Sequence, residues 1–233
     1  MELGRYFSLR DFFNYYIAGF IWSIDAYLLY KALISDASSD LLKHISPGSV
    51  LFGICAVIFP YLTGFVFSGI GNYISKEFYG CFGGDPLDWV FKFKGKKLNN
   101  FTIKQCAEFA HKLFEIPPNA FEAEPKRYFF QIRNYVEHLG GSLNNHVERL
   151  QDLETLAESL SIPLPLLTAL VVYNIPLSNV GENFYIIKAF GCMMVFCGLF
   201  SLIMKRHLKL REYRVKHIYR TFVVLSITRP HTG

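Results

Sequence analysis

Four long apolar blocks constrain what this chain can fold into more than any other feature. Three of them are almost free of charge: residues 12–30 contain only Asp25, residues 50–74 contain no charged side chain, and residues 184–204 contain only Lys188. A helix needs about 20 mostly apolar residues to cross the hydrocarbon core of a bilayer. These three blocks therefore predict transmembrane helices.

The fourth block, residues 162–177, is uncharged but shorter, and prolines stand near both of its ends. It reaches across a bilayer only if the preceding helix contributes, and leucines at helical spacing over 150–160 predict that helix. The alternative is a large soluble core of four buried helices, but soluble core helices are usually shorter and charged on one face. We therefore expect a mainly α, polytopic membrane protein with four transmembrane helices.

Lysine and arginine counts predict the topology. Eleven of these residues lie in 75–161 and eight in the tail 205–233, whereas residues 178–183 contain none. Positive residues accumulate on the cytoplasmic side of a membrane. Both termini and the 75–161 segment are therefore expected inside, in a multi-pass protein of the bacterial inner membrane.

The predicted organisation has four parts, defined by these blocks and the polar segments between them. They are an N-terminal transmembrane helix pair (1–74), a cytosolic insertion (75–161), a second transmembrane helix pair (162–204) and a basic cytosolic tail (205–233).

The cytosolic insertion is expected to be a small α(+β) domain. Apolar residues alternate with lysines around Gly95, which predicts a β-hairpin over 89–101. Thr102 as a cap predicts a helix over 102–114, and Pro125 predicts one over 126–139. A further helix is expected to begin at Ser142 or Asn144 and to run to about residue 160.

The tail carries the positive charge of the molecule. Residues 205–233 hold eight basic residues and one acidic residue, whereas the insertion holds eleven basic and twelve acidic residues. A basic helix directly after a membrane span is expected to lie against anionic lipid headgroups, and direct binding of nucleic acid is the less favoured interpretation. The residues expected at the membrane surface are Lys205, Arg206, Lys209, Arg211, Arg214 and Lys216.

Metal and cofactor sites have no support in the sequence. The five cysteines form no CxxC pair, and the seven histidines show no zinc-ligand spacing. The cysteines lie in the apolar blocks and the insertion, which fits a reducing compartment. We therefore expect no metal, no cofactor and no enzymatic activity.

Small residues in the second block predict close helix packing. Small side chains four or five positions apart let helices approach each other in lipid, and here they are Gly64, Ser68, Gly69 and Gly71. Four spans without a large external domain usually need neighbours to bury such faces, so we expect a homo-oligomer.

The two charges inside the apolar blocks are more informative, because charged groups in a bilayer are costly and usually paired or functional. Counting the helical rise from the outer ends puts both Asp25 and Lys188 about 8–10 Å below the outer surface. We expect an intramembrane charge pair between them, within one subunit or across an interface. The alternative for Lys188 is that its ammonium group reaches the outer headgroups.

One motif in the insertion resembles a known active site. Residues 133–138 read Arg-Asn-Tyr-Val-Glu-His, similar to the R-N-x-x-x-H signature of HEPN ribonucleases, which pair two such motifs across a dimer to cleave RNA. The resemblance makes Arg133 and His138 candidate catalytic residues. On an unbroken helix these positions point about 140° apart, so the alternative is a pair of solvated or salt-bridged helix residues.

The whole layout resembles small four-span membrane proteins of bacterial anti-phage defence islands. Two span pairs, a cytosolic insertion, a basic tail and the Arg133–His138 motif are similar to the membrane subunit of the Kiwa system and to accessory membrane proteins of some RNA-targeting CRISPR loci. The resemblance implies a role in sensing infection or perturbing the membrane through a cytosolic partner.

Three functions remain open at this point. The first is an oligomeric, membrane-anchored sensor or effector that docks a cytosolic partner, in phage resistance. The second is a small ion channel or membrane-perturbing pore, lined by polar residues of the spans. The third is a membrane-tethered, HEPN-like RNase that uses Arg133 and His138.

Overall fold

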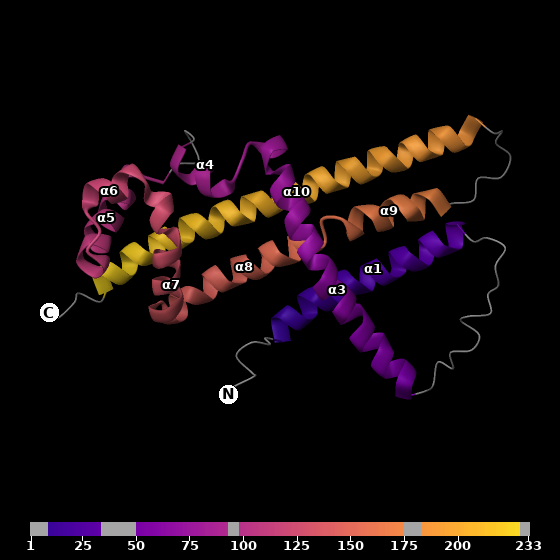
Figure 1. The fold of residues 1–233 in the computed structure, drawn as a ribbon, viewed down its shortest axis with the longest axis horizontal. Helices are drawn as coiled ribbons and strands as arrows, with labels where there is room; N and C mark the ends of the chain where they lie inside the picture. Colours follow the sequence, from indigo (N-terminus) through magenta and orange to yellow (C-terminus); the bar gives the residue numbers. More distant parts are fainter. Residues whose placement is uncertain (1–8, 34–49, 93–97, 175–182, 229–233) are drawn as a thin grey trace. The chain divides into compact units, whose positions relative to one another are not determined.

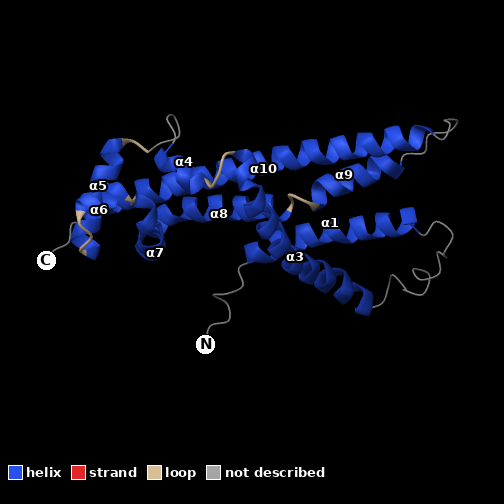
Figure 2. Cartoon of the chain, turned by 45° about the horizontal axis from the view of Figure 1, so that its top comes forward, coloured by secondary structure: helices blue, strands red, loops and turns tan. Residues whose placement is uncertain are grey.

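The computed structural model describes residues 9–33, 50–92, 98–174 and 183–228. These residues are mainly helical, and no strand occurs among them (Figures 1 and 2). In chain order the elements are α1 (Leu9–Leu33), α3 (Val50–Phe78), η2 (Tyr79–Phe82), α4 (Pro86–Lys92), α5 (Asn100–Phe114), α6 (Pro118–Ala123), η3 (Pro125–Tyr128), α7 (Phe129–Leu139), η4 (Gly141–Leu143), α8 (Asn144–Ser159), α9 (Pro163–Asn174) and α10 (Asn183–Thr228).

The β-hairpin expected over residues 89–101 is wrong. The first part of this stretch closes α4 and its end opens α5, while residues 93–97 lie outside the described residues. The apolar side chains that suggested a strand belong to the short helix α4, where Val90 is fully buried. Trp89 lies on the same helix, and its Nε1 donates a 2.5 Å hydrogen bond to the Gly83 carbonyl oxygen. The described part of the insertion is therefore helical rather than α+β.

Three helices are long and apolar enough to cross a membrane: Ala56–Phe82, Asn144–Asn174 and Ile187–Thr228. The short block at residues 162–177 gains its length from the helix before it, since α8 and α9 are separated by only a short junction. Helix α1 is not among the three. It contains Asn14, Asp25 and several tyrosines and is less apolar than α3.

The chain divides into two compact units. Unit 1 comprises Met1–Glu77 and Thr155–Arg206, and unit 2 comprises Phe78–Glu154 and His207–Gly233. The sequence predicts boundaries after residues 74, 161 and 204.

Helix α10 contributes to both units. It has 46 residues, or about 69 Å of helix, whereas crossing the hydrocarbon core takes about 30 Å. No glycine or proline follows Gly198 until Pro230, so nothing in the sequence breaks the helix where its apolar part ends. The predicted tail is therefore the continuation of the last apolar helix.

Helices α1 and α3 cross in unit 1 with their backbones in contact. A Cβ placed on Gly64 would meet the Tyr15 carbonyl group and lie 2.9 Å from the Gly19 nitrogen, and a Cβ on Gly19 would meet the Pro60 carbonyl group. Only glycine at both positions allows this approach. Two glycines, Gly19 and Gly64, therefore allow α1 to pack on α3. Of these, Gly64 is one of the predicted packing residues.

A proline inside α3 is compensated across the same crossing. Pro60 has no N–H, so the carbonyl oxygen of Ala56, four residues earlier, has no helical donor. The Tyr16 hydroxyl of α1 lies 3.5 Å from that oxygen and donates to it. Rings from both helices pack next to Pro60, with Phe12 of α1 stacked on Tyr61 of α3 at a centroid distance of 5.1 Å.

Unit 1 exposes many large apolar side chains. More than half of the surface of each of these residues is accessible: Phe59, Phe65, Val66, Tyr73, Ile187, Phe190, Met193, Met194 and Leu202. Monomeric soluble proteins rarely expose contiguous apolar surface on this scale. The surface fits helices that face lipid or neighbouring helices.

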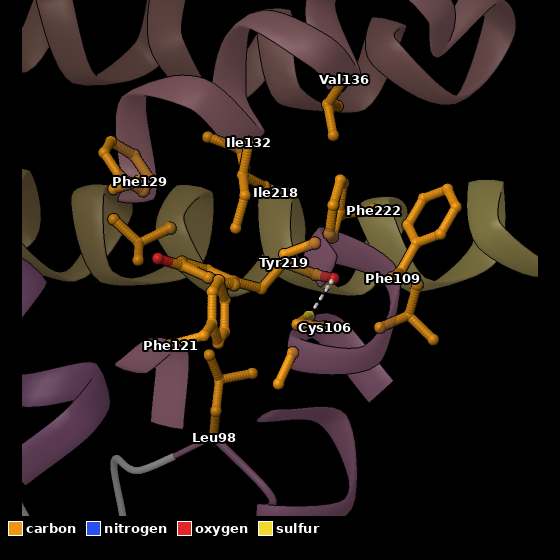
Figure 3. Close-up of a cluster of buried hydrophobic side chains, with 14 of the residues drawn as sticks. Leu98, Cys106, Phe109, Phe121, Phe129, Ile132, Val136, Ile218, Tyr219 and Phe222 are labelled. Carbon is orange, nitrogen blue, oxygen red and sulfur yellow. Dashed lines mark hydrogen bonds between the residues drawn. The ribbon is translucent and has the colours of Figure 1, made fainter. Parts of the chain in front are cut away.

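Unit 2 has a conventional apolar core, built around the second part of α10 (Figure 3). Tyr219 lies at its centre: the hydroxyl donates to the Pro125 carbonyl oxygen at 2.8 Å, and the Tyr219 carbonyl oxygen accepts from Cys106 Sγ at 3.6 Å. Phe222 packs against Phe109 at a centroid distance of 4.8 Å. Burying each such side chain contributes about 1.5–3 kcal/mol, so the continuation of α10 is the centre of a folded domain.

Candidate functional site

A buried ion pair joins α8 to α10 in unit 2. The Arg214 Nε atom lies 2.9 Å from Glu154 Oε2, and Arg214 Nη2 donates to Oε1 at 3.2 Å; both side chains are largely buried. Burial raises the pKa of Glu154, and the Arg214, Arg211 and Arg133 guanidinium groups lower it in part. Desolvation therefore affects the pKa of Glu154 more than the three guanidinium groups do. The charged form of Glu154 depends on its contact with Arg214.

Next to this pair, a chain of hydrogen bonds fixes the protonation of His207. Arg211 Nη1 donates to the Tyr79 hydroxyl oxygen at 2.6 Å, and Tyr79 lies 3.4 Å from His207 Nε2. His207 Nδ1 lies 3.3 Å from the Glu154 carbonyl oxygen, which can only accept. Nδ1 therefore carries the proton, and Nε2 accepts from Tyr79 as a neutral imidazole.

Burial lowers the pKa of His207 to about 4, with smaller contributions from Arg211 and Arg214. Because the unfolded chain binds this proton near pH 6.5 and the folded chain only near pH 4, the stability of unit 2 falls as the pH drops through this window. The parent protein should lose about 3 kcal/mol more of its free energy of unfolding between pH 7 and pH 4 than His207→Gln does, because the variant has no imidazole to protonate. Urea unfolding in detergent at both pH values measures the difference, and parallel losses in the two proteins would contradict it.

Half of the residues predicted at the membrane surface are engaged inside unit 2. Arg214 pairs with Glu154, Lys216 Nζ lies 2.7 Å from Glu212 Oε1, and Arg211 lies 3.6 Å from Asp85 Oδ1. The other three, Lys205, Arg206 and Lys209, are exposed. The six residues therefore do not form one exposed basic face on α10.

Arg133 and His138 lie on the unbroken helix α7. Arg133 Nε is 2.6 Å from Glu137 Oε1, and its Nη2 donates to Gln151 Oε1 at 3.4 Å, while His138 is exposed. The two side chains are not brought together within one chain. Cys106 is fully buried, and burial raises its pKa to about 12, so its thiol stays protonated.

A groove of about 790 Å³ opens on unit 2 where α4, α5, α6, η3 and α7 meet. Leu87, Phe91, Ile103 and Phe130 supply its apolar lining, and its charged lining residues are Asp88, Glu122, Glu124, Lys126 and Arg127. Lys126 Nζ and Asp88 Oδ1 pair at 2.9 Å. The Phe130 residue is 68% exposed. The groove therefore offers an uncovered aromatic ring beside Glu122 and Glu124, neither of which forms a salt bridge among the described residues.

Sequence reasoning missed this groove, because its lining comes from five short elements spread over residues 87–130. It also missed Gly19. A pointer to that residue did exist: Ala18 and Gly19 are the one adjacent pair of small residues in a block otherwise rich in aromatic side chains.

The two charged residues of the apolar blocks, Asp25 and Lys188, have different surroundings. Asp25 is fully buried, and neither of its carboxylate oxygens has a hydrogen-bond partner among the described residues. The Lys188 ammonium group lies 5.1 Å from the centroid of the Tyr173 ring. An ion pair between Asp25 and Lys188 therefore stays a prediction.

The predicted packing residues of α3 play unequal roles. Gly64 makes the backbone contact with α1, and a Cβ on Gly71 would lie 3.0 Å from the Glu158 carbonyl oxygen. Ser68 donates to its own helix at the Phe65 carbonyl oxygen, and nothing lies within 4 Å of a Cβ on Gly69.

Within the described ranges, no group of three or more histidine, cysteine or acidic side chains gathers to hold a metal ion. None of the protein families, curated proteins or solved structures compared with this chain matches it.

Proposed function

We propose that this chain is an oligomeric inner-membrane protein without enzymatic activity, and that its unit 2 docks a cytosolic protein as a sensor or effector platform, in anti-phage defence. The observation that carries the proposal is the groove with its exposed Phe130, in a domain whose central helix continues the last apolar helix. Exposed aromatic side chains in concave sites are typical anchors of protein interfaces.

We further propose α1 as a fourth span. It has 25 residues, about 37 Å of helix, which is enough to cross the hydrocarbon core. Its backbone contact with α3 supports a membrane helix pair, since glycines at crossings are typical of helices in lipid. Both termini and unit 2 are then inside, in agreement with the lysine and arginine counts.

The occupant of the groove is a segment of a cytosolic protein that carries one or two large apolar side chains next to lysine or arginine. The apolar lining offers space for the anchors. On the rim, Asp88 is paired with Lys126, which leaves Glu122 and Glu124 opposite the single charge of Arg127. The excess of acid favours a basic partner segment.

Site-specific photo-crosslinking in intact cells tests this function. A benzoylphenylalanine at position 130 is expected to form a cytosolic protein adduct, which also reports that unit 2 faces the cytoplasm. The matched control is position 101, because Phe101 is 63% exposed on α5 and is not part of the groove lining.

The adduct must then be reproduced with purified components. A peptide of the crosslinked segment should bind the full-length protein in detergent, and Phe130→Ala should weaken that binding at least tenfold, as expected for an interface anchor. Phe101→Ala should leave it unchanged. Equal crosslinking from both positions, or equal binding by both variants, would rule out the groove as the docking site.

A further inference from the structure

Asp25 is the most anomalous residue of unit 1. It is 0% exposed, and neither carboxylate oxygen has a hydrogen-bond partner among the described residues. Asn14 is also buried and has an unpartnered Nδ2 atom. Together with buried Ala18, these residues follow spacings of four and seven, so they share one face of α1. Two independent polar side chains thus lie unsatisfied on the same buried helix face.

The elements packed against α1 supply little charge. Helix α9, which packs along α1, has no acidic or basic residue, and its titratable group is Tyr173. Helix α3 carries charge only at Lys76 and Glu77, next to its end, besides the phenols of its tyrosines and the thiol of Cys55. The described segment of α10 in unit 1 carries Lys188, Lys205 and Arg206, together with the thiols of Cys192 and Cys197.

An isolated carboxylate in such surroundings is very costly, and buried charges in proteins are paired, bound to an ion or neutralised. No ion pair links Asp25 to a described residue. A hard cation such as Ca²⁺ requires six or more oxygen ligands, and Asp25 belongs to no group of three or more histidine, cysteine or acidic side chains in the described segments. Neutralisation by a proton is the one remaining way to remove the cost.

We infer that Asp25 is a proton-binding site inside unit 1, occupied at neutral pH, so that the residue is a carboxylic acid and not half of an ion pair. The site goes beyond the docking function, because it gives the membrane part a group whose charge changes when the proton leaves. Such residues inside membrane helices are often functional.

A hydrophobic carbodiimide applied to the full chain in native membranes tests this inference. The acid O–H adds across one C=N bond of the reagent, and the acyl group then moves to nitrogen, so a stable N-acylurea retains every atom of both reactants. A carboxylate in an ion pair has no proton to add. We expect one adduct at Asp25 by mass spectrometry, and none with a water-soluble carbodiimide, which does not enter the apolar interior.

Two variants separate the possible outcomes. Asp25→Asn should lose the adduct and keep the thermal stability of the parent, because an amide has nearly the shape of the neutral acid. Lys188→Met should react as fast as the parent within about twofold. An unreactive parent, or a carboxyl group that becomes reactive only in Lys188→Met, would show that Asp25 is charged and paired, and would overturn the proton site.

Discussion

Replacing Gly64 by alanine or leucine is expected to separate α1 from α3, whereas the same changes at Gly69 should have almost no effect. The first added atom at position 64 already meets the Tyr15 carbonyl group, its carbon at 2.7 Å, and no side-chain rotation relieves a clash with backbone. Overpacking typically costs 1–3 kcal/mol, and we expect about 3 kcal/mol or more here. Alanine should show most of the effect, because the Cβ atom is what clashes.

The two tryptophans of the chain allow a direct measurement of this effect. In a Trp89→Phe background Trp22 is the sole tryptophan, and its ring stacks on Phe67 of α3. Gly64→Leu should change the Trp22 emission spectrum and lower the midpoint of thermal unfolding in detergent. Gly69→Leu is the matched control on the same helix, and identical spectra and midpoints for the two variants would disprove the crossing.

The parts of the fold that sequence reasoning obtained correctly are those marked by proline, glycine or a change in hydropathy. The apolar blocks correspond to helices, and the predicted helix ends at Phe114 and Leu139 agree with the structure because Pro117 and Gly140 follow them. Helix α5 begins earlier than predicted, since Asn99 and not Thr102 accepts the capping hydrogen bond, from the Phe101 N–H at 3.2 Å.

The errors have a common physical origin in tertiary packing. The alternation of apolar residues and lysines fits a short helix as well as a hairpin. Packing of the apolar residues in the core of unit 2 favours the helix, and a local pattern does not contain this information. The same applies to Arg214, which reads as one basic residue among eight in the tail. Its partner Glu154 lies 60 residues earlier, and no local pattern joins the two.

The buried pair makes Arg214 the residue whose loss should destabilise unit 2 most. Arg214→Ala leaves Glu154 buried without its main partner, and breaking a buried ion pair in this way costs about 3–5 kcal/mol. Arg220→Ala is the matched control, because Arg220 is exposed on the same helix, and its cost should stay within about 0.5 kcal/mol. Replacing both partners by apolar residues, Glu154→Leu with Arg214→Met, should restore most of the stability, since no charge is then left unpaired.

The pH dependence distinguishes this explanation from a general packing defect. Burial already raises the pKa of Glu154 in the parent, and losing Arg214 must raise it further. The folded variant then holds a proton that the unfolded chain releases above about pH 4.5, so its stability falls as the pH rises. Urea unfolding of the Trp22→Phe background, read through buried Trp89 of unit 2, should show Arg214→Ala closer to its parent at pH 5 than at pH 8. A deficit that is the same at both pH values would mean that lost packing, and not an unpaired carboxylate, destabilises the variant.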